Sequence, residues 1–172
     1  RGLGDVYKRQ AQEHDFLIYK DAKDLTNFRD TEEFQKISDT SVDFYWATVI
    51  YFKKSEQNKI FFDLTQHIQE NWDHYNSIFQ VNKGIFRNDH VFSIAIHIMN
   101  GYQKGDFAHK LPGIKYYTAD RDILWDLEDD NFFFLLEKQN HLGEYTPLRI
   151  KGSSVHVMNK FSLNRIIDKG EM

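Results

Sequence analysis

The sequence predicts a protein of the α/β class, with a mixed sheet flanked by helices. A β-branched and aromatic segment at 43–52 is typical of a strand, segments at 55–75 and 86–101 show helical spacing, and strand-like segments follow from 114 onward. A strand, then helices, then further strands is the order of an α/β domain. With 172 residues, 41% hydrophobic and 16% aromatic, the chain is long enough to bury one core.

Composition and charge exclude several other classes. A formal net charge of -4 and an isoelectric point near 6.1 give no basic footprint for nucleic acid. The chain has no cysteine, which excludes a disulfide framework and a thiolate metal site. No apolar run approaches the roughly 20 residues that a membrane-spanning helix needs. We therefore expect a cytoplasmic protein with no membrane span and no nucleic-acid partner.

The first ten residues are expected to be a non-native leader. The chain begins with Arg1 rather than methionine, and residues 1–10 resemble translated adapter sequence. We therefore expect an N-terminally truncated protein, cut near Ala11, with upstream sequence missing. Residues 11–40 are mixed and charged, which predicts a connector with little core, a short apolar piece at 16–19 and a helix at 31–37.

The segment 43–52 is the most clearly predicted strand. It is apolar on both faces, as a central strand covered on both sides would be. Ser55 is then expected to cap a long amphipathic helix that runs through Tyr75 and lies on the sheet. Its apolar stripe is expected to contain Ile60, Phe61, Leu64, Ile68, Trp72 and Tyr75. His67 and His74 lie beside this stripe without the i, i+4 spacing of a metal-binding pair, so we expect packing or surface roles for them.

The stretch 86–101 is the one around which the chain is organised. It contains a charged cluster, Arg87-Asn88-Asp89, followed by a helix that is apolar nearly all round and should therefore be buried. Asn88 or Asp89 is expected to cap this helix, and Asn100-Gly101 to end it. Two roles are open for Asp89: a helix cap, or an acidic side chain presented to a cleft.

The C-terminal part is predicted to be mostly strands. These are expected at 114–118 and 132–136, with 145–150 and 153–158 forming a pair around Lys151-Gly152, before a short amphipathic helix at 161–168. Asp120-Arg121-Asp122 has the Asp-x-Asp pattern of a cation-binding motif, but its position favours a capped helical turn before 123–125.

Four short motifs occur in a fixed order: the strand segment 45–49, Asp89-His90 at the start of a helix, Leu111-Pro112 in a loop, and Val155-His156-Val157-Met158-Asn159-Lys160. This order resembles the C-terminal half of GT-A-fold glycosyltransferases of the glycogenin type, which use nucleotide-diphosphate sugars. The resemblance covers roughly 43–160. Each motif is weak alone, so the argument depends on their order.

The resemblance implies a set of site residues. Asp89 would be catalytic, facing the sugar or the acceptor, and His156 would complete a site for Mn²⁺ or Mg²⁺. A metal ion and cations suit this chemistry, because a departing diphosphate develops negative charge. Lys160 would lie near that diphosphate. The substrate-binding residues would be Trp46, Thr48, Arg87, Asn88, Asn159 and Lys160.

Departures from the family pattern leave other functions open. Trp46 stands where the family has Asn, Thr48 and Asn159 where it has Gly, and His90 where it has Gln, while Lys160 comes two places before the family's Lys. Nothing in 11–43 matches the family's metal-binding Asp-x-Asp. The first alternative is a non-catalytic GT-A-like binding or structural module. A metal-dependent hydrolase is a second alternative. We also expect the 172-residue chain by itself to be poorly stable and inactive in sugar transfer.

Overall fold

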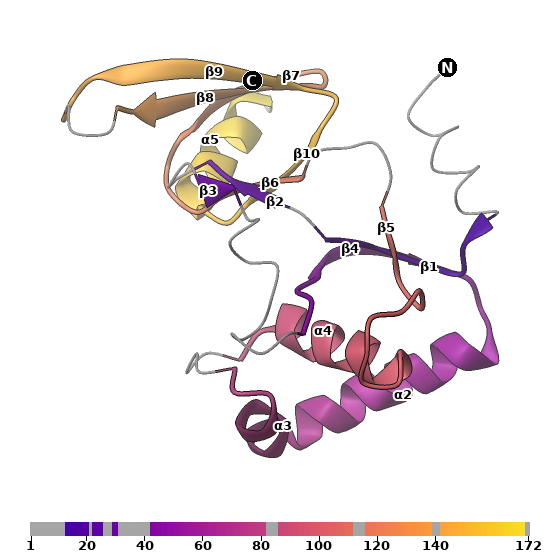
Figure 1. The fold of residues 1–172 in the computed structure, drawn as a ribbon. Helices are drawn as coiled ribbons and strands as arrows, with labels where there is room; N and C mark the ends of the chain where they lie inside the picture. Colours follow the sequence, from indigo (N-terminus) through magenta and orange to yellow (C-terminus); the bar gives the residue numbers. More distant parts are fainter. Residues whose placement is uncertain are drawn as a thin grey trace. The chain divides into compact units, whose positions relative to one another are not determined.

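The computed structural model describes residues 13–20, 22–25, 29–30, 42–81, 86–111, 116–138 and 142–170 (Figure 1). The described residues form three small sheets and four helices, which confirms the mixed α/β class. They divide into two compact units. Unit 1 comprises the described residues within Arg1–Asp21 and Glu32–Gly113, and unit 2 those within Ala22–Thr31 and Ile114–Met172. Each unit is described by itself.

The sheet of unit 1 is built around β1 (Phe16–Tyr19). This strand pairs antiparallel with β4 (Trp46–Phe52) on one side and parallel with β5 (His109–Lys110) on the other. All four of its residues are at most 2% exposed. The prediction that 16–19 belongs to a connector with little core was wrong. Its partners come from distant parts of the chain, so its local sequence gives little sign of its central position.

Strand β4 confirms the strand predicted at 43–52 but not its position. It lies at an edge of the described sheet, and Val49 and Phe52 are each 47% exposed. The expectation of a central strand covered on both sides was therefore wrong. Aromatic and β-branched residues favour a strand wherever it lies in a sheet, so composition did not distinguish an edge from a centre.

Two helices follow β4 where one was predicted. Helix α2 (Glu56–Glu70) is capped by Ser55, whose Oγ accepts a hydrogen bond from the Asn58 amide at 3.2 Å. The helix ends at Asn71, whose backbone and side-chain N–H groups both donate to the carbonyl of His67, and α3 (Trp72–Ile78) begins next. The buried side of α2 contains Asn58, Phe61, Thr65 and Ile68. Ile60, predicted in the apolar stripe, is 57% exposed.

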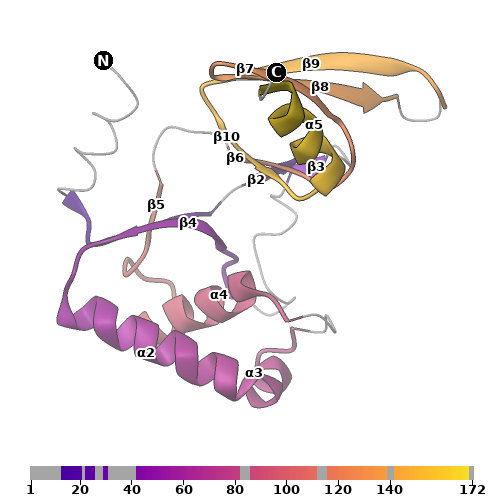
Figure 2. The same cartoon turned by 180° about the vertical axis from the view of Figure 1, so that it is seen from behind.

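The apolar helix predicted at 86–101 is α4 (Asn88–Met99), and it is buried as expected. Helices α2 and α4 lie on the same side of the strands β1 and β4 (Figure 2). An aromatic cluster fills the space between them. The ring of Phe61 lies 4.7 Å from Phe16, 5.5 Å from Phe92 and 5.1 Å from Phe107, measured between centroids. The core of unit 1 therefore joins the sheet, both helices and the segment before β5.

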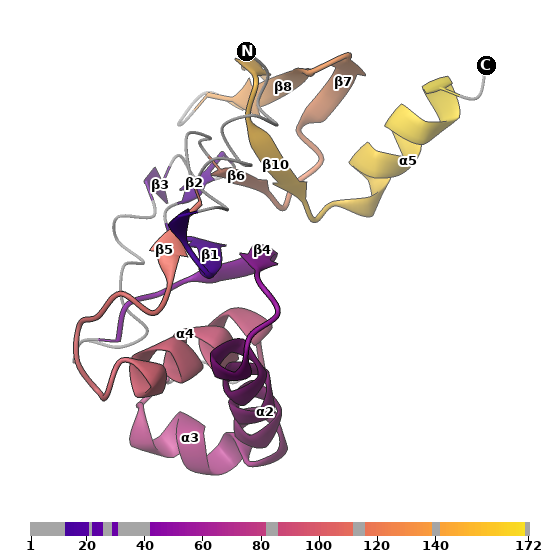
Figure 3. The same cartoon turned by 90° about the vertical axis from the view of Figure 1, so that its right-hand side faces the viewer.

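The described residues of unit 2 form two sheets and one helix (Figure 3). In the first sheet, with order β10-β6-β2-β3, the strands β10, β6 and β2 are parallel and β3 is antiparallel to β2. The second, with order β7-β8-β9, is antiparallel. The bounds are β2 (Ala22–Asp24), β3 (Arg29–Asp30), β6 (Tyr116–Ala119), β7 (Leu124–Glu128), β8 (Asn131–Glu137), β9 (Tyr145–Lys151), β10 (Ser154–Val157) and α5 (Lys160–Gly170).

Most elements predicted for this region are confirmed, but one pairing was wrong. Strands β9 and β10 flank Lys151-Gly152 as expected, yet they belong to different sheets. Strand β9 pairs with β8, whereas β10 pairs in parallel with β6. Both sheets contribute to one core, in which Ala119, Leu124 and Phe134 are almost completely buried. Parallel pairing needs a crossover between distant segments, and a short turn between two strands does not reveal it.

The helix predicted at 31–37 and the segment 112–115 lie outside the described residues. Among the described helices, none combines the length and the apolar character that crossing a membrane would require.

Candidate functional site

Asp89 attaches the first turn of α4 to the start of β4. Its Oδ1 accepts a hydrogen bond from the Ala47 amide at 2.8 Å. Its Oδ2 accepts two from Arg87, at 2.5 Å from Nη2 and 3.1 Å from Nε. The N-cap position belongs to Arg87, which makes no side-chain capping bond. The prediction that Asn88 or Asp89 caps this helix was therefore wrong, because the Asp89 carboxylate binds the strand.

Ser93 makes a second attachment one turn along α4. The Tyr45 amide donates to Ser93 Oγ at 2.8 Å, and this hydroxyl donates to the Asp89 carbonyl at 2.6 Å. Four residues of a helix span about 6 Å along its axis, and two residues of a strand span about 6.6 Å. Because these lengths are similar, Asp89 and Ser93, four residues apart on the helix, can accept from the amides of Ala47 and Tyr45, two residues apart in the strand segment. The side chains of α4 thus occupy the edge of this strand segment, where a neighbouring strand would otherwise pair.

Three predicted site residues lie together at this attachment. The Arg87 guanidinium carbon is 5.5 Å from the ring centroid of Trp46, a distance typical of a cation–π contact. Arg87 also binds Asp89, so one side chain connects the strand to the helix. Trp46 is buried, whereas Asn88 on α4 and Thr48 on β4 are exposed.

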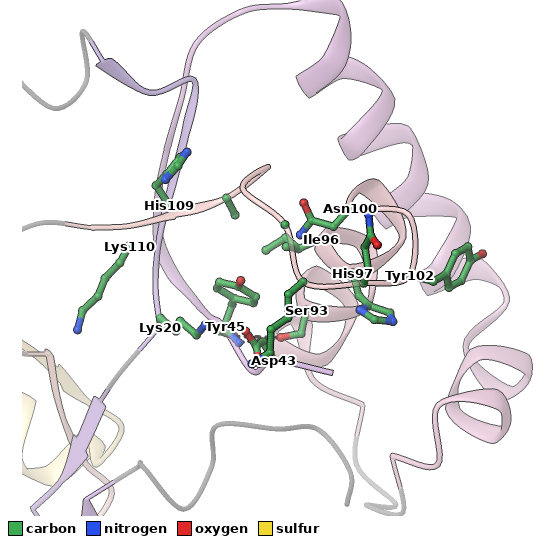
Figure 4. A pocket seen from close by; sticks show the side chains of 14 residues that line it. Lys20, Asp43, Tyr45, Ser93, Ile96, His97, Asn100, Tyr102, His109 and Lys110 are labelled. Atoms are coloured by element: carbon green, nitrogen blue, oxygen red, sulfur yellow. Dashed lines mark hydrogen bonds and ion pairs between the residues drawn. The ribbon is translucent and has the colours of Figure 1, made fainter. Parts of the chain in front are cut away.

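A cleft of about 470 Å³ adjoins this attachment within unit 1 (Figure 4). Tyr45 and Ser93 line it, together with residues from the end of β1, the C-terminal half of α4 and the segment that leads to β5. The other lining residues are Lys20, Asp43, Ile96, His97, Asn100, Tyr102, Gln103, Lys104, Gly105, Ala108, His109 and Lys110.

An ion pair and an aromatic ring form one side of the cleft. Lys20 Nζ lies 2.6 Å from Asp43 Oδ2 and 5.5 Å from the centroid of the Tyr45 ring. Burial raises the pKa of the Tyr45 hydroxyl, an effect that Lys20 opposes and Asp43 reinforces. Burial also lowers the pKa of His97 and of His109, which disfavours the charged form of both imidazoles.

The loop after α4 forms another side of the cleft. Gly101 has φ +71°, so the helix ends at Asn100-Gly101 as predicted. Asn100 Oδ1 then accepts a hydrogen bond from the Phe107 amide at 3.0 Å. A Cβ at position 105 would lie 2.4 Å from this oxygen, so glycine allows the loop to approach Asn100 closely.

The other predicted site residues belong to unit 2. His156 lies on β10, and its Nδ1 is 3.0 Å from Tyr116 Oη on β6. Asn159 Oδ1 accepts a hydrogen bond from the Ser162 amide at 3.1 Å, so Asn159 caps the start of α5. Lys160 is the exposed first residue of that helix. His156 thus lies on the parallel strand β10, and Asn159 and Lys160 follow it, in the order predicted from the sequence.

The Asp120-Arg121-Asp122 segment does not form the predicted helical turn. It leads into β7, and Asp122 accepts hydrogen bonds from Ser162 Oγ at 2.7 Å and from Arg165 of α5. These bonds, with that of Arg165 the larger contribution, lower the pKa of the Asp122 carboxyl. The segment thus anchors α5, a contact that joins residues 40 positions apart.

The predicted site residues therefore fall into two groups, Trp46, Thr48, Arg87, Asn88 and Asp89 in unit 1 and His156, Asn159 and Lys160 in unit 2. Within the described ranges, no three His, Asp or Glu side chains come together as a metal site would require. One imidazole does not hold a divalent ion. The described residues therefore do not by themselves form the metal site that the resemblance implies.

Sequence reasoning missed the cleft almost completely. Its lining residues are drawn from positions 20, 43–45, 93–100 and 102–110, and no motif joins them. The one local signal was the polar stretch after Gly101, in which Gln103, Lys104 and Lys110 occur close together.

Comparisons of the chain with protein-family models, curated proteins and solved structures gave no match.

Proposed function

We propose that this chain is part of a GT-A-like glycosyltransferase domain that transfers a sugar from a nucleotide-diphosphate donor to an acceptor, assisted by Mn²⁺ or Mg²⁺. The observation that carries the proposal is a juxtaposition in unit 1. Two of the motifs that resemble the family are separated by about 40 residues in the sequence, yet Asp89 Oδ1 lies 2.8 Å from the Ala47 amide. Such a contact would hold a catalytic carboxylate in a fixed position beside the start of β4.

The environment of Asp89 suits a group that must be held in one position. Its side chain is 14% exposed, and it has a backbone donor on one oxygen and a guanidinium on the other. A reacting group benefits from such preorganisation, because no reorientation is needed during reaction. In the proposed function Asp89 faces the sugar or acceptor, and Arg87 and Trp46 position it.

The proposed roles in unit 2 follow from the position of its residues after β10. Ligands of open α/β sheets bind at the carboxyl ends of parallel strands. His156, Asn159 and Lys160 lie on or directly after a strand that is parallel to β6. Lys160 is exposed and could bind a diphosphate oxygen, and His156 would be one metal ligand among others.

A non-catalytic GT-A-like binding or structural module is the second candidate. It is favoured by the structural bonds that the predicted residues already make. Both carboxylate oxygens of Asp89 have partners within the chain, and the side-chain oxygen of Asn159 caps a helix. Such bonds would be retained in a relative that kept the scaffold and lost the reaction.

The Asp89→Asn substitution separates these two candidates. Asparagine keeps an oxygen that accepts from the Ala47 amide but loses the charge, so the free energy of unfolding should change by no more than about 1 kcal/mol. A carboxylate that takes part in transfer would be lost. The assay would use the longest reading frame that contains this chain, with uridine and guanosine diphosphate sugars and Mn²⁺, and would measure release of the nucleoside diphosphate.

The transferase proposal expects turnover in the wild type and none in a normally folded Asp89→Asn variant. An Asp73→Asn variant is a suitable control, because it removes the charge of an exposed carboxylate in the first turn of another helix of the same unit. Wild-type turnover in Asp89→Asn would remove Asp89 from the reaction. Absence of nucleotide-sugar binding by the wild type would contradict the proposed function as a whole.

A further inference from the structure

The described lining of the cleft of unit 1 contains more cationic than anionic side chains. Among its described lining residues, three are lysines, Lys20, Lys104 and Lys110, and one, Asp43, carries a carboxylate. The oxygen of Asn100 is already bonded to the Phe107 amide, which leaves its NH₂ group as the part that a ligand could contact. A ligand that fits this surface should therefore carry acceptors and negative charge.

The Tyr45 hydroxyl adds a further donor. Its ring is 5% exposed and lies beside Lys20, and the hydroxyl makes no hydrogen bond within the described part of the chain. Figure 4 shows the ring among the other lining side chains, between Lys20 and the residues of α4. A polar group at the end of a buried ring needs a partner, which is water or a ligand in this cleft.

From this arrangement we infer that the cleft binds a small anionic ligand that carries phosphate groups. Its volume of about 470 Å³ lies within the range of roughly 300–1,000 Å³ that is usual for small-molecule sites. The three lysines and the Asp43 carboxylate, which pairs with Lys20, together leave an excess of two positive charges in the described lining. Tyr45 and Asn100 supply neutral donors.

The kind of cation favours phosphate over carboxylate. Planar carboxylates are best recognised by the two-pronged guanidinium of arginine, and the described lining residues include none. Lysine is a point charge that binds phosphate oxygens from any direction. The neutral and charged donors come from separate parts of unit 1, namely Tyr45 before β4, Asn100 at the end of α4 and Lys104 in the loop before β5, which suits a group that carries several oxygens.

The C-terminal end of α4 does not prevent anion binding. A helix C-terminus carries partial negative charge on its last carbonyls. Here the carbonyls of Ile96, His97 and Ile98 accept hydrogen bonds from the amides of Asn100, Tyr102 and Gly101, respectively, at 2.8–3.0 Å. These carbonyls are therefore occupied by the chain itself.

This binding site is separate from the proposed transfer reaction. None of the residues predicted from the family resemblance lines the cleft. A test with pyrophosphate and no sugar donor therefore measures anion binding alone, and its outcome does not depend on whether the protein transfers sugar.

The test is a titration of the chain with pyrophosphate at low ionic strength, followed by calorimetry and by the NMR signals of the backbone amides at 101–110. Wild-type protein should bind in a saturable manner and shift these amides. Lys104→Gln and Lys110→Gln should each weaken binding about fivefold or more, as expected for loss of one charge that contacts the ligand. Tyr45→Phe, which removes only the hydroxyl, should weaken it about threefold.

Lys59→Gln is the matched control, because Lys59 is an exposed lysine of the same unit on α2, away from the cleft. Thermal melting of every variant shows whether it folds. Equal weakening by Lys59→Gln and Lys104→Gln would overturn the site, as would shifts confined to amides outside 101–110. Citrate binding as tightly as pyrophosphate would overturn the assignment to phosphate, and the absence of saturation at about 10 mM would overturn the proposal.

Discussion

Helix α4 of unit 1 and helix α5 of unit 2 are attached to their neighbouring strands by different kinds of bonds. Helix α4 uses Asp89 and Ser93, whose oxygens accept from backbone amides of the segment 45–47, and Ser93 is completely buried. Helix α5 uses Arg165 and Lys169, whose charged groups bind Asp122 and Asp126 near the surface, and its buried Ser162 donates to the carboxylate of Asp122, which is 43% exposed.

The difference concerns how readily water can replace each attachment. If a partly buried amide loses its acceptor, the protein loses roughly 1–3 kcal/mol of stability, because the amide then has neither a protein partner nor full hydration. An exposed ion pair contributes at most about 1 kcal/mol, because water and salt compete with it. The position of α4 relative to β4 should therefore be the more rigid of the two, which suits a helix that carries a candidate site.

The largest effect is expected from Asp89→Ala. This change removes the acceptor of the Ala47 amide and the partner of Arg87, so the free energy of unfolding of unit 1 should fall by roughly 2–3 kcal/mol. Denaturant titration followed by the NMR indole signals measures each unit separately, because Trp46 and Trp72 belong to unit 1 and Trp125 to unit 2.

Asp73→Ala is the control for this prediction. Asp73 is also an acidic residue in the first turn of a helix, but it is exposed. If both variants lose the same stability, the effect of Asp89 comes from the helix dipole and not from its bond to the strand.

A smaller effect is expected from Asn159→Ala. The variant removes the oxygen that caps α5 and should destabilise unit 2 by about 1 kcal/mol, whereas Asn159→Asp should restore the cap. Hydrogen exchange of the first amides of α5 measures the change. Unchanged exchange in Asn159→Ala would show that the cap contributes little and would favour the proposed ligand-binding role of this residue.

The smallest effect should appear as a pH dependence of α5. The pKa of Asp122 is lowered below its ordinary value of 3.8 by Arg165 and Ser162, so its contribution to stability is present above that pH and is lost as pH falls through the lowered pKa. Because Asp122 is 43% exposed, the loss should be less than about 1 kcal/mol.

This loss should be visible in the Trp125 indole signal, since Arg165 and Lys169 lie over that ring at 5.8 and 5.5 Å. Asp122→Asn should reduce the acid response of Trp125 and leave the signals of unit 1 unchanged. A response as large in unit 1 as in unit 2 would contradict the contrast between the two helices.

The sequence pattern correctly predicted those features that depend only on residues close together in the chain. The Ser55 cap, the burial of α4 and its end at Asn100-Gly101 follow from neighbouring residues, and all three are confirmed. The apolar stripe of 55–75 continued past Asn71, so the periodicity predicted one helix. The chain instead ends α2 at Asn71, whose side chain donates to the His67 carbonyl, and begins α3 at Trp72.

Features that depend on distant residues were not predicted. The central position of β1 depends on β4 and β5, and the parallel pairing of β10 depends on β6. The anchoring of α5 by Asp122 and the cleft likewise join residues far apart in the chain. The placement of Asp89 at the start of an apolar helix was foreseen, but its bond to Ala47 was not.

The two units are interleaved along the chain, and this affects the order in which they can form during synthesis. Strand β1 pairs with β5 across about 90 residues, and β2 pairs with β6 over a similar separation. The first sheet cannot be completed until the ribosome has released the chain beyond residue 110, and the second, which also contains β10, not until beyond residue 157. Contacts of such long range slow folding. Nascent chains should therefore carry the apolar strand β1 without β5 for much of translation, a period in which a chaperone that binds extended apolar segments would have the most to protect.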